Sequence, residues 1–309
     1  MNFKTSTLII LLAIFVLPFQ SVAGENGLLW RISGNGLAQP SYLFGTHHLA
    51  PVSFLETVSG LSEAFESTEQ VVGEVDASNP MAVIKLQIQM LQRATMPPGI
   101  TYGQLLSPED FALLENKLRD LTGRSLRELG GLKPAMLSTI ISIAWMQRYF
   151  PEMTGEMSID EYFQHKAVAR SRPVRALDTA ESQLYSMFDV SSIERQAKLL
   201  MCRIHNAEAE AGRELIHRMN ELYYAFDLKG LYALYVEYQL ADAGAGTCPP
   251  TEEELNAATI NRHLRCIDRL SAIIQEKSSF IAVGALHLVG EYGLIEGLRR
   301  RGYTVEAVR

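Results

Sequence analysis

Two stretches, "SYLFGTHHLA" (residues 41–50) and "SFIAVGALHLVGEYG" (residues 279–293), decide the fold. In each, an apolar run reaches a glycine, Gly45 or Gly284, and a histidine follows three residues later. Short apolar runs bounded by turn residues are typical of buried strands. Because the same pattern appears near both ends of the chain, we expect strands over 41–44 and 280–283 to lie close together in one sheet.

Further strands are indicated on both sides of these two stretches. The run "LLWRIS" (28–33) and the run at 41–44 flank "GNGLAQP", whose turn residues predict a β-hairpin. The runs "EQVVGEVD" (69–76), "RPVRALD" (172–178) and "YTVEAV" (303–308) also predict strands. Helical spacing of apolar residues covers 54–68, about 80–171, 180–240 and about 252–276, and "GLIEGLRR" predicts a short helix before Gly302.

Strands therefore cluster at the two ends of the chain, and the middle is mostly helical. We predict one α/β domain over residues 24–309, with a mixed central sheet, flanking helices and a large helical insertion (about 80–171 and 180–276). We expect the helical middle to cover a site on the sheet. The sequence shows no repeat, low-complexity run or Pro-rich linker, which favours one domain over two.

Residues 1–23 have the pattern of a cleaved secretory signal. Lys4 precedes the apolar run Leu8–Leu17, and Ser21-Val22-Ala23 places small residues before the expected cut. We expect a mature chain from Gly24, periplasmic or secreted, without a stable membrane anchor. Lys4 is the only charged residue of the signal, so 27 basic and 35 acidic residues remain, a formal charge of −8 that argues against nucleic acid as a partner.

Three cysteines can form at most one disulfide in an oxidising compartment. Cys248 lies in "GAGTCPP", which has the composition of a loop, whereas Cys202 and Cys266 lie in helical patterns. A bridge from Cys248 to either of them is consistent with the sequence, and the oligomeric state is left open.

Polar, ionisable residues follow four of the apolar strands. In open α/β sheets, ligands bind at the carboxyl ends of the strands. Imidazole and carboxylate groups there suit a divalent ion such as zinc, manganese, cobalt or iron. Two histidines and one carboxylate after these strands are a plausible set of ligands for such an ion. The strand ends carry Gly45, Thr46, His47 and His48, then Glu74 and Asp76, then Asp178, and finally Gly284 and His287.

Each feature also has an ordinary structural interpretation. A single Gly-x-x-His is a weak signal, and Asp178 before Thr179 could be a helix N-cap. Four further histidines lie on helical patterns, where surface or capping roles are expected: His165, His205, His217 and His263. The chain has neither the H-E-x-x-H pattern of zinc proteases nor the G-x-S-x-G pattern of serine hydrolases.

The motifs resemble the TraB/GumN family, whose relatives include the Tiki proteases. That family has two G-x-x-H motifs and a glutamate in the strand after the first; His48, Glu74 and His287 match these positions. "RALDTAESQ" is similar to a further family stretch, with Asp178 in place of the usual glutamate and Thr179 and Gln183 matching. Where the family has Arg-Asn before the last motif, this chain has Ile260-Asn261, with Arg262 one place later.

The resemblance implies a metal-dependent hydrolase, most simply a peptidase that uses metal-activated water. In that role Glu74 would bind the ion or act as general base, with His48 and His287 as ligands, and the substrate would be a peptide, an ester or a lactone. The alternative implied by other relatives is a non-catalytic protein that binds a metal, haem or a peptide. Both use the same histidines, so the sequence does not separate them.

Overall fold

A computed structural model describes residues 26–151, 157–206, 209–244 and 248–309. Its six-stranded sheet has the order β4-β3-β5-β2-β1-β6. The strands β2 (Ser41–Thr46), β5 (Ser279–Gly284), β3 (Gln70–Gly73) and β4 (Val174–Ala176) run parallel to one another. The strands β1 (Leu29–Gly34) and β6 (Tyr303–Ala307) are antiparallel additions at one edge. The predicted mixed α/β sheet is confirmed, and so is the pairing of the two decisive stretches.

The hairpin of β1 and β2 forms where the turn residues predicted it. Asn35 (φ 48°) and the flanking Gly34 and Gly36 (φ 77° and 79°) adopt left-handed backbone conformations, which glycine and asparagine accept readily. Leu29 pairs with Phe44 and Ile32 with Ser41 in this hairpin. The turn thereby places Gly45 and Thr46 at the end of β2 that adjoins the end of β5.

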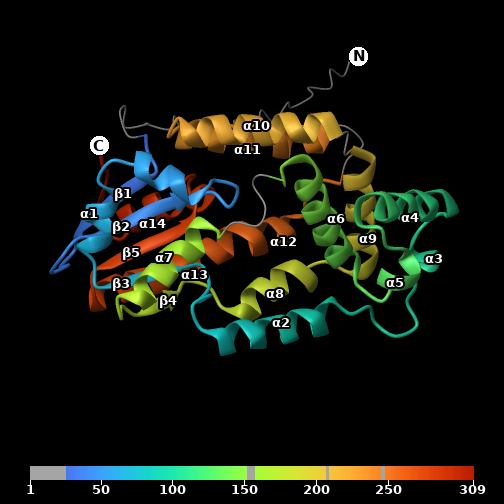
Figure 1. Ribbon diagram of the computed structural model, residues 1–309, viewed down its shortest axis with the longest axis horizontal. Helices are drawn as coiled ribbons and strands as arrows, with labels where there is room; N and C mark the ends of the chain where they lie inside the picture. The colour runs from blue at the N-terminus through green and yellow to red at the C-terminus, as the bar shows by residue number, and fades with distance from the viewer. Residues whose placement is uncertain (1–25, 152–156, 207–208, 245–247) are drawn as a thin grey trace, which may run out of the picture.

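Helices cover both faces of the sheet (Figure 1). On one face, Phe44 and Phe280 contact Phe163 of α7 (Ile159–Ala169), and Phe280 also contacts Phe65 of α1 (Leu61–Glu66). On the other face, the side chains of α13 (Asn261–Glu276) and α14 (Leu294–Arg300) pack against the strands. Burial of strands on both faces explains their continuous apolar runs.

A second body of helices lies beside the sheet (Figure 1). Its own apolar cluster joins α4, α6 and α9 through residues such as Leu114, Leu137 and Leu200. A smaller cluster joins α2 to α8 through Ala94, Leu184 and Phe188. The bounds are α2 Pro80–Ala94, α3 Tyr102–Leu105, α4 Pro108–Thr122, α5 Leu126–Leu129, α6 Pro134–Tyr149, α8 Ala180–Phe188 and α9 Ile193–Asn206.

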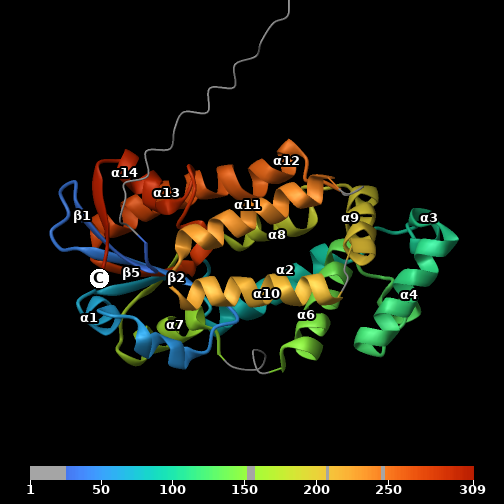
Figure 2. The same cartoon turned by 90° about the horizontal axis from the view of Figure 1, so that it is seen from above.

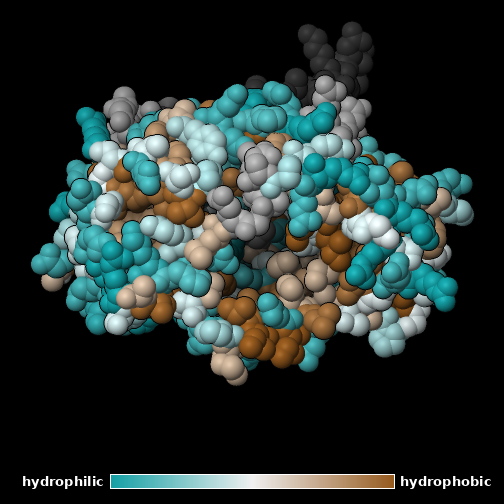
Figure 3. All heavy atoms as spheres, in the orientation of Figure 1, coloured by the Kyte–Doolittle hydropathy of each residue, from teal (hydrophilic) through white to brown (hydrophobic). Residues whose placement is uncertain are grey.

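Two long helices, α10 (Ala209–Tyr224) and α11 (Leu228–Gly244), lie side by side over this assembly (Figure 2). The outer face of α2 carries exposed apolar side chains, visible as a brown area at the lower edge of the molecule (Figure 3): Met81, Ile84, Ile88 and Leu91. In the part of the chain that the structure describes, no helix is long and apolar enough to span a bilayer.

Two helical predictions need correction in detail. The pattern over 54–68 forms a 3₁₀ helix (Val52–Thr57) and then α1, because Gly60 adopts a left-handed conformation (φ 72°) between them. The pattern over 252–276 is α12 (Glu252–Leu255), a π-helical turn (Asn256–Ile260) and α13 in direct succession. The predicted start of α4 is confirmed, with Ser107 as N-cap and Pro108 as first residue.

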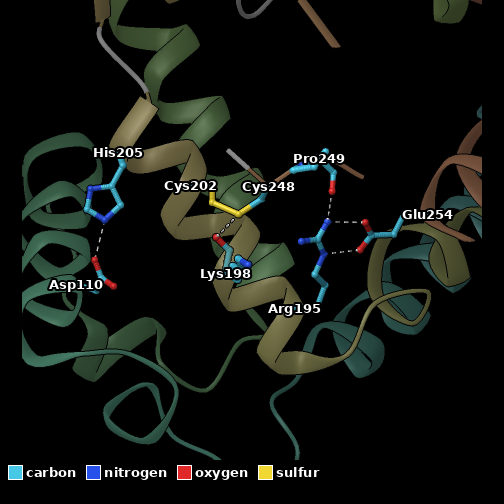
Figure 4. The surroundings of a disulfide bond; sticks show 8 residues. All are labelled: Asp110, Arg195, Lys198, Cys202, His205, Cys248, Pro249 and Glu254. Carbon is cyan, nitrogen blue, oxygen red and sulfur yellow. Dashed lines mark hydrogen bonds and ion pairs between the residues drawn. A yellow bond between two sulfur atoms is a disulfide. The ribbon is translucent and has the colours of Figure 1, made fainter. Parts of the chain in front are cut away.

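One disulfide joins Cys202 on α9 to Cys248 (Figure 4). Cys266 is a buried free thiol. Of the two pairings that the sequence left open for Cys248, the structure therefore has the one with Cys202. An ion pair reinforces the bridge, since Arg195 on α9 binds Glu254 on α12 (2.9 Å) and the carbonyl of Pro249 (2.6 Å). The segment that leads into α13 is therefore attached to α9 by both covalent and ionic contacts.

Candidate active site

Arg262, in the first turn of α13, links two carboxylates at the carboxyl ends of β3 and β4. Its Nη2 donates to Oε2 of Glu74 and its Nε to Oδ2 of Asp178, both at 2.8 Å. The backbone N–H of Gly284, at the end of β5, donates to Oε1 of Glu74 at 3.1 Å. Residues from three parallel strands thus meet at the sheet edge that the sequence indicated.

His287 completes this group from the short 3₁₀ helix η4 (Ala285–His287) that follows β5. Its Nε2 lies 3.3 Å from Oε1 of Glu74 and 3.5 Å from Nη1 of Arg262. Its Nδ1 lies 2.7 Å from Nε2 of His263, and the two rings meet edge to face. Because His263 sits directly after Arg262 on α13, one helical turn contributes both side chains to the site.

The electrostatics of the group favour an ionised Glu74 and a neutral His263. Burial alone raises the pKa of Glu74, but the hydrogen bond and charge of His287, the charge of Arg262 and the Gly284 N–H outweigh it, so its pKa lies well below the usual range. Burial and the charges of His287 and Arg262 lower the pKa of His263 to about 4. At neutral pH, Glu74 therefore carries a negative charge, and the imidazole of His263 is neutral.

His48 lies in a different set of contacts. Its Nδ1 faces Oδ2 of Asp160 at 3.3 Å, and its side chain is 70% exposed. Oδ1 of Asp160 accepts a hydrogen bond from Thr46 (2.9 Å), whereas its buried Oδ2 has no hydrogen-bond partner among the described residues. The hydrogen bond with Asp160 raises the pKa of His48, and the charge of Glu74 adds to the increase.

His47 points to the opposite side of the same loop. Its Nε2 donates to Oδ1 of Asn220 on α10 (2.8 Å), and its ring lies 5.1 Å from that of Tyr223. The hydroxyl of Tyr223 donates to the carbonyl of Gly45 (3.0 Å). Burial lowers the pKa of His47, so this neutral imidazole serves to fix the loop to α10.

The remaining supporting residues have local roles. Asp76 accepts hydrogen bonds from the N–H and the hydroxyl of Ser78 (3.0 and 2.6 Å), before α2 begins. Thr179 is the N-cap of α8, so the capping role considered for Asp178 belongs to its neighbour. Gln183 lies on α8 and donates its backbone N–H to the carbonyl of Thr179 (3.1 Å).

The two motif glycines permit close approach of neighbouring groups. A Cβ at Gly45 would lie 3.1 Å from both Cα of Ala285 and Cδ2 of Leu288, so β2 contacts η4 too closely for a side chain. A Cβ at Gly284 would lie 3.4 Å from Oε1 of Glu74 and 3.5 Å from Cδ2 of His287. Gly45 therefore serves packing, whereas Gly284 leaves room between the two site residues.

The donor types suit a divalent ion, but their arrangement does not hold one. Glu74 and His287 face each other, whereas His48 pairs with Asp160, and the described residues contain no group of three His, Cys, Asp or Glu side chains placed to bind a metal. The guanidinium of Arg262 lies beside Glu74, where the positive charge of a metal ion would otherwise be expected. The convergence of His48 with Glu74 and His287 on one ion stays a prediction.

A separate cleft of about 680 Å³ lies between α8, α12 and the start of α13. Asn261 and Arg265, one helical turn apart, line it together with Glu252 and Glu253. It shares no lining residue with the small cavity around Glu74 and His287. The cleft is therefore a neighbour of the site and not the site itself.

Comparison with known proteins identifies the family of the chain. The profile described as "TraB/PrgY/gumN family" matches residues 28–307. The chain belongs to the TraB/PrgY/gumN family. The match confirms the resemblance seen in the motifs around His48, Glu74 and His287.

The curated relatives that match the chain are distant. Metalloprotease TIKI2 of Danio rerio is 23% identical over 91% of this chain and 61% of its own length. Metalloprotease TIKI1 of Homo sapiens is 23% identical over 91% of this chain and 62% of its own length. The chain thus spans about three-fifths of the length of the curated relatives it matches. No solved structure matches the chain.

Three residues of the site were missed or misread in the sequence. His263 was expected in a surface or capping role but is 8% exposed and contacts His287. Arg262 departs from the family spacing yet binds both Glu74 and Asp178. Asp160, in the first turn of α7, was not identified as a site residue from the sequence. For His263 the sequence held a local signal, because its spacing places it on the same helix face as Cys266, Ile267 and Leu270.

Proposed function

We propose that this chain is a peptidase that acts at the carboxyl ends of β2, β3 and β5. The observation that carries the proposal is the contact between Glu74 and His287 at the second Gly-x-x-His motif. Membership of the TraB/PrgY/gumN family supports it, because the curated relatives are named metalloproteases. Hydrolysis of a peptide amide is the reaction that this name implies for the shared motifs.

Each site residue has a charge and a proton-carrying capacity that suit a different chemical role. Glu74 is ionised throughout the neutral range, so it carries negative charge and has no proton to donate. His287 is the imidazole in contact with Glu74, and an imidazole is the side chain that most often serves as general acid or base. Arg262 supplies positive charge beside both, where it would stabilise negative charge that develops on a reacting carbonyl oxygen.

A divalent ion is the cofactor that the relatives' names imply, with zinc, manganese, cobalt or iron matching imidazole and carboxylate donors. His48, Glu74 and His287 are the proposed ligands. We assign no step to the ion, because His48 is engaged with Asp160 and Arg262 contacts Glu74 in the present arrangement.

Export is the second part of the proposal. The signal-like pattern of residues 1–23 lies outside the described residues, and it supports a periplasmic or secreted chain that begins near Gly24. The Cys202–Cys248 bridge supports the same location, because such bonds persist in oxidising compartments.

The test uses the purified chain 24–309 with a peptide library, in chelator and with each of the four ions added singly. We expect cleavage that is lost in Glu74→Gln and His287→Ala and is kept in His205→Ala, whose imidazole lies on the exposed face of α9 beside Asp110. His48→Ala decides whether the first motif takes part. If the chain hydrolyses esters or lactones but no peptide, the proposed substrate class is wrong. If it binds metal, haem or peptide without turnover, it is a binding protein and not an enzyme.

A further inference from the structure

The polar cleft beside the site lies between two helical walls. One wall is α8, and the other is the continuous helix made of α12, the π-helical turn and α13 (Figure 1). Near the start of α8, Arg265 donates to the hydroxyl of Ser182 across 2.8 Å. Beyond the end of α8, Ser191 donates to Glu254 across 2.5 Å. The order of these two contacts shows that the walls run antiparallel.

Both walls reach the active site at the same end of the cleft. Asp178, which binds Arg262, comes two residues before α8 begins at Ala180. Asn261 lines the cleft and directly precedes Arg262 on α13. A substrate whose reacting bond lies beside Arg262 would therefore have its adjoining segment in this cleft.

The lining of the cleft suits a peptide chain. The amide groups of Asn256 and Asn261 can both donate to and accept from a peptide main chain. Tyr185, on α8, is 44% exposed and offers an aromatic surface for the aliphatic part of a side chain. The volume of about 680 Å³ lies within the range of ligand pockets, which is roughly 300–1,000 Å³.

The charges at the two ends of the cleft have opposite signs. Arg265 lies at the end near the site, whereas Glu252 and Glu253 line the far end, in the first turn of α12. Their neighbour Glu254 is engaged in the cap of α12 and in the ion pair with Arg195. In the part of the chain that the structure describes, the side chains of Glu252 and Glu253 have no hydrogen bond or ion pair. Both carboxylates are therefore available to a ligand in the cleft.

We propose that this cleft binds the segment of a peptide substrate that adjoins the cleaved bond, and that Glu252 and Glu253 select a positive charge in that segment. The charge is a lysine or arginine side chain or a free amino terminus, because each offers charged N–H donors to a carboxylate. The inference rests on the proposed peptidase function, since that function places the cleaved bond beside Arg262.

The length of the cleft sets the position of the positive charge. Glu252 lies ten residues before Arg262 on the continuous helix, a distance of about 15 Å at the usual rise per residue. An extended peptide covers this distance in roughly four or five residues. A basic side chain closer to the cleaved bond would meet Arg265, which repels it.

Binding measurements test this selection without turnover. Ten-residue peptides of alanine and serine, blocked at both ends, carry one lysine, one glutamate or neither at each position in turn. Isothermal titration in chelator gives their affinities for the chain 24–309, and mass spectrometry verifies that they stay intact. We expect the best lysine peptides to bind at least about threefold more tightly than the matching glutamate peptides, and the difference to shrink at high salt. Uncharged peptides with a free amino terminus test the other source of the charge.

Variants of the far end of the cleft identify the residues responsible. Glu252→Gln/Glu253→Gln should remove the preference for lysine, and Glu252→Lys/Glu253→Lys should reverse it in favour of glutamate. Glu109→Gln is the matched control, because Glu109 is also exposed in the first turn of a helix, α4, but does not line the cleft. It should leave the preference unchanged.

Equal binding of lysine and glutamate peptides by the parent overturns the proposal, and so does a preference that survives in both double variants. Tight binding of the peptides with a free amino terminus, lost in the same variants, supports the proposal and identifies the amino terminus as the source of the charge. The salt dependence of the parent supplies the same information if a double variant fails to fold.

The same peptides separate this inference from the proposed function. With ions added, we expect the cleaved bond to lie roughly four or five residues from the lysine. A lysine preference without cleavage under any ion would overturn the peptidase and leave Glu252 and Glu253 as a binding site for cationic peptides. Cleavage that ignores the lysine and is unchanged in Glu252→Gln/Glu253→Gln would leave the peptidase in place and overturn the role of the cleft.

Discussion

At the residue scale, Arg262 is the side chain that opposes the binding of a divalent ion between Glu74 and His287. Its guanidinium contacts Glu74, Asp178 and His287, so a divalent ion between Glu74 and His287 would meet a positive charge at close range. We predict that Arg262→Gln binds Mn²⁺ or Zn²⁺ at least about tenfold more tightly than the parent, which corresponds to roughly 1.4 kcal/mol. Isothermal titration with the metal salt measures this.

The matched control for this titration is Arg265→Gln. Arg265 lies one turn further along α13, but it hydrogen-bonds to Ser182 and lines the separate cleft. Its replacement should leave the affinity unchanged. Equal or weaker ion binding by Arg262→Gln would show that the arginine does not compete with the ion.

His263 should make stability depend on pH. Its pKa is about 4 in the folded chain and near 6.5 when unfolded, so the unfolded state takes up the proton first as pH falls. The stability from the neutral imidazole is fully present above pH 6.5 and is lost as pH falls towards 4, by about 2–3 kcal/mol. The charged groups facing it are His287, Arg262 and Glu74.

Urea unfolding between pH 4 and 7.5, compared with His263→Gln, isolates this contribution because glutamine does not titrate. The parent should lose free energy of unfolding faster than the variant across this range. Parallel curves for the two proteins would rule out a neutral, buried His263.

Sequence reasoning located Glu74 and His287 because both follow buried strands directly, and strand ends of a parallel sheet meet at one edge. It did not find His263 or Arg262 as partners. Their contacts join residues that are 24 and 188 positions apart, and depend on how α13 rotates against the sheet. Helical periodicity gives the buried face of such a helix but not the atoms it meets.

At the scale of elements, the close contact between β2 and η4 holds His287 in place. A Cβ at Gly45 would press on Cα of Ala285, which is backbone, and on Leu288. We predict that Gly45→Ala lowers the free energy of unfolding by about 1–3 kcal/mol, the usual cost of overpacking. Denaturant unfolding checks this, with Gly103→Ala in the open surroundings of α3 as the control that should change little.

An unfolding midpoint for Gly45→Ala equal to that of the parent would mean that η4 can shift freely away from β2. A shift of that kind would also move His287, so the ¹H–¹⁵N spectrum of the histidine side chains should be recorded for the same variant. Unchanged stability together with moved His287 signals would identify η4 as the element that yields.

Most elements were predictable because each has a local signal. The Asn35 turn, the Ser107-Pro108 start of α4 and the glycine after α14 at Gly302 (φ 85°) all lie where turn and capping chemistry placed them. The break at Gly60 and the π turn before α13 were not predicted. Both occur inside otherwise regular apolar spacing, where only packing against neighbouring elements reveals the interruption.

At the scale of the whole molecule, the site depends on a helical segment that begins at α12 (Glu252–Leu255), next to α9 of the second body of helices. The segment from Cys248 through α12 leads without a break into α13, which carries Arg262 and His263. This segment is attached to α9 by the Cys202–Cys248 bridge and the Arg195–Glu254 ion pair (Figure 4). The second body of helices thereby anchors the start of α13.

Opening the bridge should therefore weaken both stability and the start of α13. The sequence separation is 46 residues, for which the chain-entropy account gives about 4 kcal/mol, within an observed range of roughly 0–5 kcal/mol. We predict that Cys202→Ser/Cys248→Ser unfolds at lower denaturant and exchanges amide hydrogens faster over residues 252–263. Adding a reductant should bring the parent to the same state and leave the double variant unchanged, because only the parent has a bond to reduce. Exchange in β5 should stay slow in both, since the sheet has its own core. Equal exchange over 252–263 in the two proteins would mean that the ion pair of Arg195 alone anchors α13.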